Sequence, residues 1–148
     1  MTPHKYKVLR GLEGLRVIVE EIDLPGAPVI EAGLQRDVEL MLEQADVPLF
    51  TTERWLQTPG APYLYVNITA TRLQGQGLRS FSLDLELHQQ THLARNPEVT
   101  ISSCTWERGL IDMVPEEQLL EELGPALCDL VAVFIDDYWA ANTALQFN

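Results

Sequence analysis

Apolar and polar residues alternate along two neighbouring stretches in the middle of the chain. From Leu64 to Ala70 every second side chain is apolar, and the same period of two returns from Phe81 to Leu87. This period is typical of strands that bury one face and leave the other polar. The connection at Gln74–Gly77 holds two glycines, which reach positive φ without a steric penalty. The pattern therefore predicts an antiparallel hairpin.

Weaker alternation predicts the rest of the sheet. Residues 15–20 are apolar on both faces, which favours a central strand, and residues 47–50 fit a short second strand. Residues 55–62 carry loop-forming residues, and the turn at Asn96-Pro97 precedes a last strand over residues 99–107. The strands between Tyr63 and Glu107 are joined by short turns, so we expect an antiparallel meander.

Two stretches change to the helical period. Residues 30–45 place apolar side chains at helical spacing, and Pro115 fits the first turn of a second helix. A kink or two abutting helices are expected at Gly124-Pro125. The apolar stripe of this second helix comprises Leu120, Leu123, Leu127, Leu130, Val131, Phe134 and Tyr138.

The order β-α-β-β-β-β-α predicts an α+β fold. We expect two layers, with a mostly antiparallel sheet of four to five strands and two helices packed on one face. The length of 148 residues fits a single domain over residues 1–148, in which residues 1–10 form an extended amino-terminal segment.

The charge balance narrows the classes of partner. Ten Lys and Arg stand against 22 Asp and Glu, a net charge of −12. Such a chain is not expected to bind nucleic acid or an anionic membrane, because both depend on clustered basic side chains. No apolar run reaches the roughly 20 residues of a spanning helix, and no apolar block of a secretory leader follows the first charges.

Candidate chemistry is sparse, so we predict no catalytic residue, no metal site and no cofactor. His88 and His92 share a strand face but lie more than about 10 Å apart at the rise of a strand. Cys104 fits a small buried side chain, and its use as a nucleophile with His88 on an adjacent strand is the alternative. Cys128 falls in the apolar stripe. Adjacent carboxylates such as Asp136-Asp137 diverge on a helix and are expected to be solvated.

Aromatic residues point to binding instead of catalysis. Tyr63, Tyr65 and Asn67 occupy the polar face of one predicted strand, next to a loop that contains Trp55. Aromatic rings beside polar groups are common in protein interfaces, although they also suit an ordinary solvent-facing sheet. The candidate interaction surface also includes apolar residues near the end of the chain: Trp139, Leu145 and Phe147.

Five segments resemble a group of small bacterial proteins of unknown function: residues 11–17, 62–67, 93–97, 105–106 and 130–142. Members of that group carry a secretory leader, so the resemblance implies a periplasmic or extracellular location. The order of elements is also similar to that of the amino-terminal domain of the translocation protein TolB. Neither resemblance implies an activity, because a fold does not fix a function.

These observations favour a non-catalytic interaction module, an accessory subunit of a bacterial envelope or extracellular assembly. A protein partner or self-association is expected. One alternative is a small-molecule carrier with a pocket between the sheet and the last helix. The other is a hydrolase-like enzyme that uses Cys104 and His88. A cytoplasmic location is the alternative if no leader was removed.

Overall fold

The computed structural model describes residues 7–24, 29–73 and 75–143. Its elements are β1 (Arg16–Val19), α2 (Glu31–Gln44), α3 (Thr52–Gln57), β2 (Tyr63–Leu73), β3 (Leu78–Leu93), β4 (Asn96–Pro115), a 3₁₀ turn (Glu116–Gln118) and α4 (Leu119–Thr143). The predicted α+β class is confirmed, with a four-stranded mixed sheet.

The sheet has the strand order β1-β2-β3-β4, in which only β1 runs parallel to its neighbour. The predicted hairpin is confirmed, and its pairing ends with Leu73 opposite Leu78. Gly75 and Gly77 in its connection have φ of 76° and 61°, the positive values that glycine adopts most easily. The antiparallel meander of β2, β3 and β4 is confirmed as well.

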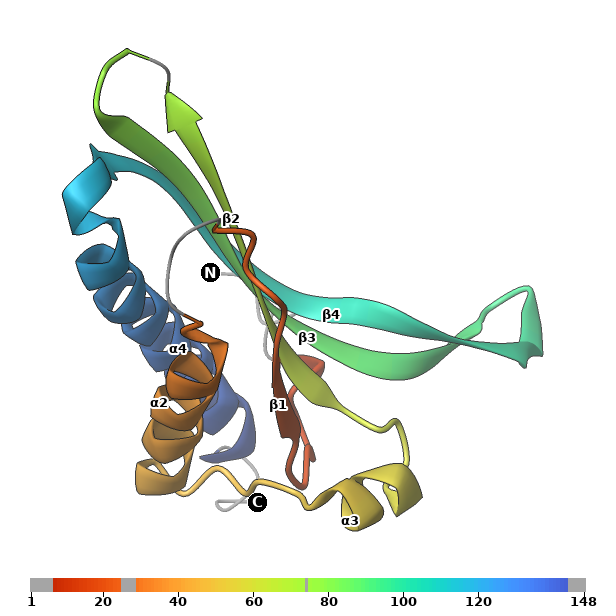
Figure 1. Cartoon of the computed structure of the whole chain (residues 1–148). Coiled ribbons are helices and arrows are strands. Elements are labelled where there is room, and N and C mark those ends of the chain that lie inside the picture. Colours follow the sequence, from red (N-terminus) through yellow and green to blue (C-terminus); the bar gives the residue numbers. More distant parts are fainter. Residues whose placement is uncertain (1–6, 25–28, 74, 144–148) are drawn as a thin grey trace.

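The two long helices, α2 and α4, cover the same face of the sheet (Figure 1). Alternate residues of β2 and β3 bury their side chains against these helices, and the ring of Trp106 on β4 meets Phe134 of α4 edge-on at 5.0 Å. The predicted two-layer packing is therefore confirmed. The opposite surface of the sheet carries the polar residues of the same strands and is called the outer face below. The hairpin formed by β3 and β4 projects past the two long helices (Figure 1).

Two strand predictions need correction. The strand expected over residues 15–20 is present as β1, but it lies at the edge of the sheet instead of its centre. Ile18, which suggested a second buried face, is in register with Tyr65 and is only partly buried. Residues 47–50 form only an isolated bridge between Leu15 and Leu49. Pro48 has no N–H to donate, and the chain turns into α3 directly afterwards.

The helical boundaries also differ from expectation. Part of the predicted loop at residues 55–62 belongs to α3, which begins after Thr51, whose hydroxyl accepts a hydrogen bond from the Arg54 N–H. This is the usual contact of a helix N-cap. Pro115 ends β4 instead of lying in the first helical turn, because β3 supplies pairing partners as far as Leu78. The last strand is correspondingly longer than residues 99–107.

The last helix runs without interruption through Pro125, so the prediction of two abutting helices is wrong. The stripe is buried in the core from Leu123 to Tyr138, and this burial outweighs the cost of one proline. Leu120, which the sequence also placed in the stripe, is instead 42% exposed. Asp137 is buried at 6% exposure, contrary to the expected solvated pair, because the helical turn places it three residues from Phe134 on the packed side.

The amino-terminal segment is not extended where the structure describes it. Residues 7–10 form a turn, and Leu9 is completely buried in the core. Asn142 of α4 donates from its side-chain amide to the Leu9 carbonyl and accepts from the Gly11 N–H. Among the described helices, none is both long and apolar enough to cross a membrane.

Candidate functional site

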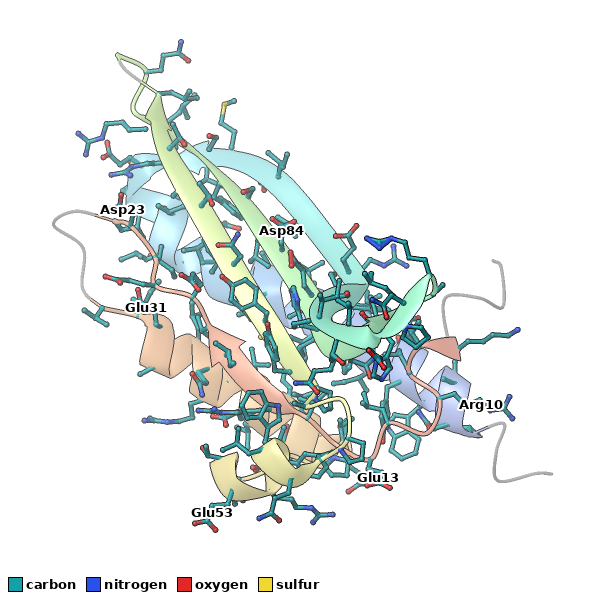
Figure 2. All side chains as sticks on the ribbon, turned by 90° about the vertical axis from the view of Figure 1, so that its right-hand side faces the viewer. Arg10, Glu13, Asp23, Glu31, Glu53 and Asp84 are labelled. Atoms are coloured by element: carbon teal, nitrogen blue, oxygen red, sulfur yellow. The ribbon has the colours of Figure 1, made fainter. Side chains whose placement is uncertain are left out.

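Two rows of side chains cross the outer face at its middle. One row runs from Arg16 on β1 through Tyr63 and His88 to Cys104 on β4, as successive pairing partners. The row beside it contains Tyr65, Glu86 and Glu107. These residues stand on the same surface as Asp84, which Figure 2 labels near the centre of the face turned to the viewer.

An aromatic cluster occupies this part of the outer face. The Tyr63 and His88 rings stack at 5.1 Å between centroids with an angle of 7° between their planes. Trp55 lies edge-on to Tyr63 at 6.1 Å, and Tyr65 lies edge-on to His88 at 5.7 Å. The Trp55 indole N–H donates to the Pro62 carbonyl at 2.8 Å, which fixes α3 beside the sheet. These contacts hold the cluster in a defined geometry.

Carboxylates surround the cluster. The Tyr65 hydroxyl donates to Glu20 Oε2 at 2.6 Å, and this hydrogen bond raises the pKa of Tyr65 to about 12. Burial and the charges of Glu20 and Glu86 add to the same effect. Glu86 also lies directly opposite Glu107 in the β3–β4 ladder. Facing like charges destabilise a sheet, so this arrangement favours a bound cation.

A hydrogen bond of 2.9 Å joins His88 Nε2 to Glu86 Oε1. The Cys104 thiol lies close by, and one ligand atom from each of Glu86, His88 and Cys104 falls within 4.8 Å of the other two. The structure thus brings together two residues that the sequence suggested as a pair and one carboxylate that it did not. An oxygen, a nitrogen and a sulfur atom, each of a type that binds metal ions, therefore lie near one another on the surface.

A β-bulge is what places Cys104 on the outer face. Trp106 is opposite Leu87, but His88 is opposite Cys104, so Thr105 is the extra residue. Without this irregularity, strict alternation would put Cys104 on the same side as the buried Trp106. The expectation of a buried strand cysteine is therefore wrong, and Cys104 is exposed.

The setting of Cys104 does not favour a nucleophile. Neighbouring atoms shield the thiol partly from water, and this partial desolvation raises its pKa. The carboxylates of Glu86 and Glu107 raise the pKa further. The thiol donates to the Trp106 carbonyl at 3.3 Å. A nucleophilic cysteine needs the reverse, a lowered pKa from nearby positive charge. The alternative of a hydrolase using Cys104 and His88 gains no support from this geometry.

The predicted surface residues separate into two groups. Trp55, Tyr63 and Tyr65 come together in the aromatic cluster, and Asn67 lies further along β2 opposite Asp84. Trp139 lies elsewhere, partly buried on α4, where its indole N–H donates to the Ala45 carbonyl at 2.8 Å. It therefore joins α4 to the end of α2. Leu145 and Phe147 lie outside the described residues.

Sequence reasoning did not select three acidic residues of the site, Glu20, Glu86 and Glu107. Glu86 carried a usable signal, because it precedes His88 by two positions on a strand and so shares its face. Glu20 and Glu107 gave no signal of this kind. Their places depend on the parallel pairing of β1 and on the register of β4.

One pocket bears on the carrier alternative. It has a volume of about 190 Å³, and no residue of α4 lines it. The lining residues are Val8, Arg10, Gly11, Leu12, Glu13, Thr58, Pro59, Pro62 and Gln89. This is below the roughly 300–1,000 Å³ of common ligand sites. The prediction of a pocket between the sheet and the last helix is not supported by this cavity.

Comparison with known proteins adds no relative: no protein-family model matches the chain, and a search of curated proteins finds no significant match. Evidence on the function therefore comes from the outer face and its chemistry. The resemblance to exported bacterial proteins and to the TolB domain stays a prediction.

Proposed function

We propose that this protein is a non-catalytic interaction module whose outer face binds a protein segment carrying Lys or Arg side chains. The observation that carries the proposal is the aromatic cluster of Trp55, Tyr63, Tyr65 and His88, flanked by Glu20 and Glu86. Rigid aromatic rings supply contact area at a low entropic cost, and neighbouring carboxylates select positive charge.

The chain itself contains an example of this mode of recognition. The Arg16 guanidinium lies over the Trp55 ring, 5.3 Å from its centroid. Cations bind the faces of aromatic rings because the ring quadrupole is negative there. A basic side chain of a partner can use the neighbouring tyrosines in the same way. The net charge of −12 attracts such a partner over a longer range.

The outer face also offers apolar contact next to the charged part. Ile111 and Met113 on β4 are 82% and 55% exposed, and they pair with Ser82 and Ser80 on the outer face. Exposed apolar residues beside polar ones are typical of binding surfaces. A second copy of this chain fits this face poorly, because it would oppose the same carboxylates. The charge therefore favours a different, basic protein over self-association.

A role as an accessory subunit of an envelope or extracellular assembly forms part of this proposal. Two observations support this role: the aromatic outer face is suited to protein contact, and the surroundings of Cys104 do not favour catalysis. The proposed location is supported by the resemblance to exported bacterial proteins. Identification of the partner tests the role and the location together.

Affinity capture from the source organism, with cross-links mapped by mass spectrometry, tests the proposal. We expect one basic protein to be captured, with cross-links on β2 and β3 and with binding that weakens as salt rises. The double variant Tyr63→Ala, Tyr65→Ala should lose this protein. Leu120→Ala, at an exposed position of α4, is the matched control and should retain it.

Three results would contradict the proposal: no captured protein, a captured protein that the tyrosine variant binds equally well, or cross-links confined to the helices. Size-exclusion chromatography with light scattering gives an independent measure. A homodimer that dissociates in the tyrosine variant would identify self-association and would also contradict it.

A further inference from the structure

The outer face brings together three side chains with different ligand atoms. Glu86 and His88 are two residues apart on β3, so their side chains lie on the same face. Cys104 lies beside them on β4 because of the bulge at Thr105. Two hydrogen-bonded strands hold the backbone of all three residues. We propose that Glu86, His88 and Cys104 bind one zinc-class divalent transition-metal ion. This site shares Glu86 and His88 with the proposed partner surface, but metal binding by the three residues needs no partner and can be tested without one.

The spacing of the ligand atoms is close to what a metal ion needs. Zinc lies about 2.0–2.3 Å from nitrogen, oxygen and sulfur ligands, so tetrahedral ligands are roughly 3.3–3.8 Å apart. The three atoms here lie within 4.8 Å of one another, and Glu86 Oε1 is already 2.9 Å from His88 Nε2. Coordination through His88 Nε2 would replace its hydrogen bond to Glu86, and coordination by Cys104 would replace its hydrogen bond to the Trp106 carbonyl. Small side-chain rotations then have to bring the three atoms to these spacings.

The charges around the trio give an independent reason for a cation. Glu86 faces Glu107 across the ladder, and Glu20 lies nearby as the partner of Tyr65. Within the described part of the chain, the ion-pair partner of Glu86 is His88 rather than Lys or Arg. A bound divalent ion would offset the two facing carboxylates and would also favour the thiolate form of Cys104.

The ligand types narrow the choice of metal. Magnesium and calcium prefer sites made of oxygen atoms, whereas thiolate and imidazole together favour zinc and its neighbours in the transition series. Three protein ligands leave one coordination position for water or for a group from a bound molecule. The Tyr63 ring stacked on His88 fixes the orientation of the imidazole, as partners outside the ligand shell commonly do.

Titration of the whole chain with Co²⁺ and Zn²⁺ tests the proposal. Wild-type protein should bind one ion per chain, and Co²⁺ should produce a thiolate-to-cobalt charge-transfer band. Cys104→Ser should abolish the band, and His88→Gln should weaken binding at least about tenfold. Cys128→Ser and His92→Gln are matched controls, because they remove the other cysteine and a neighbouring histidine of β3. Both should bind as the wild type does.

X-ray absorption of the zinc-loaded wild type provides a test that needs no variant. One sulfur and one imidazole in the first coordination shell are expected. The proposal is overturned if the wild type binds no ion, if the spectrum shows only oxygen or imidazole ligands, or if Cys128→Ser removes the band while Cys104→Ser keeps it. Partner capture by Cys104→Ser separates the two proposals, because this variant retains the tyrosines of the outer face.

Discussion

The Tyr65 hydroxyl is the group whose protonation the structure alters most clearly. Its hydrogen bond to Glu20 stabilises the neutral phenol, and ionisation would place a phenolate beside Glu20 and Glu86. The pKa of Tyr65 is accordingly raised to about 12. The pKa of Tyr65 is therefore a measure of the negative potential at this part of the outer face. The proposed partner and the proposed metal site both depend on this potential.

Glu20→Gln should lower the pKa of Tyr65 towards the ordinary value near 10, because it removes the strongest cause of the shift. Ultraviolet titration of tyrosine, with Tyr65→Phe to assign the transition, measures the change. Glu121→Gln, at an exposed position on α4, should leave this pKa unchanged. An equal shift in both variants would contradict the assignment to Glu20.

The raised pKa of Tyr65 also makes the free energy of unfolding depend on pH. The folded protein holds the Tyr65 proton more tightly than the unfolded chain does. Its contribution to the free energy of unfolding is therefore complete below about pH 10 and is lost as the pH rises from about 10 to about 12.

Among the elements, the sheet and α4 are joined by a buried hydrogen bond. The Trp106 indole N–H on β4 donates to Asp137 Oδ2 on α4 at 2.9 Å, and both residues are only 6% exposed. Asp136, the next residue along the helix, is exposed. The adjacent pair offers a direct comparison of a buried and a solvated carboxylate on one helix.

Asp137→Ala should lower the free energy of unfolding by roughly 1–3 kcal/mol, because it leaves a buried indole N–H without an acceptor. Asp136→Ala should change it by less than about 0.5 kcal/mol. Urea unfolding followed by tryptophan fluorescence measures both values. Similar losses in the two variants would show that the bond between Trp106 and Asp137 does not stabilise the contact between the sheet and α4.

The bulge at Thr105 is the other element-scale feature with consequences for function. It reverses the alternation of β4, so Cys104 stands beside His88 on the outer face while Trp106 remains in the core. Bulges are common next to functional sites because they redirect a side chain without ending the strand. The candidate metal site depends on this single extra residue.

At the scale of the whole molecule, the excess of acidic residues opposes folding. The net charge is −12, and among the described residues the arginine–carboxylate pairs are those of Glu116 with Arg72 and Arg79. Both arginines lie at the end of the sheet where β4 passes into α4. Most of the remaining negative charge is therefore balanced by solvent ions, and its repulsion is greatest at low ionic strength.

Raising NaCl from about 10 mM to about 150 mM should increase the Tm, because the screening length falls from about 30 Å to about 8 Å. Thermal unfolding followed by circular dichroism measures the change. The gain should be smaller in Glu121→Lys, Glu122→Lys, which removes repulsion at two exposed positions of α4. A Tm that is independent of salt, or that falls, would contradict the role of charge repulsion.

Features that depend on local periodicity could be predicted from the amino-acid sequence. The alternation in residues 64–70 and 81–87 was sufficient for the hairpin and its buried face, and the helical spacing was sufficient for α2 and α4. Aromatic and polar residues also drew attention to the surface around Tyr63 and Tyr65, whose role in binding stays a prediction. These patterns are readable because each follows from the geometry of a single element.

Which side chains meet across elements could not be predicted in this way, because it depends on the three-dimensional arrangement of the chain. Pairing between distant segments determines the edge position of β1 and the bulge at Thr105. The same pairing brings Glu86, His88 and Cys104 together. A shift of one residue in such pairing moves a side chain to the other face, and no local pattern records that shift. The layers of this protein were therefore predictable from the sequence, and the candidate metal site was not.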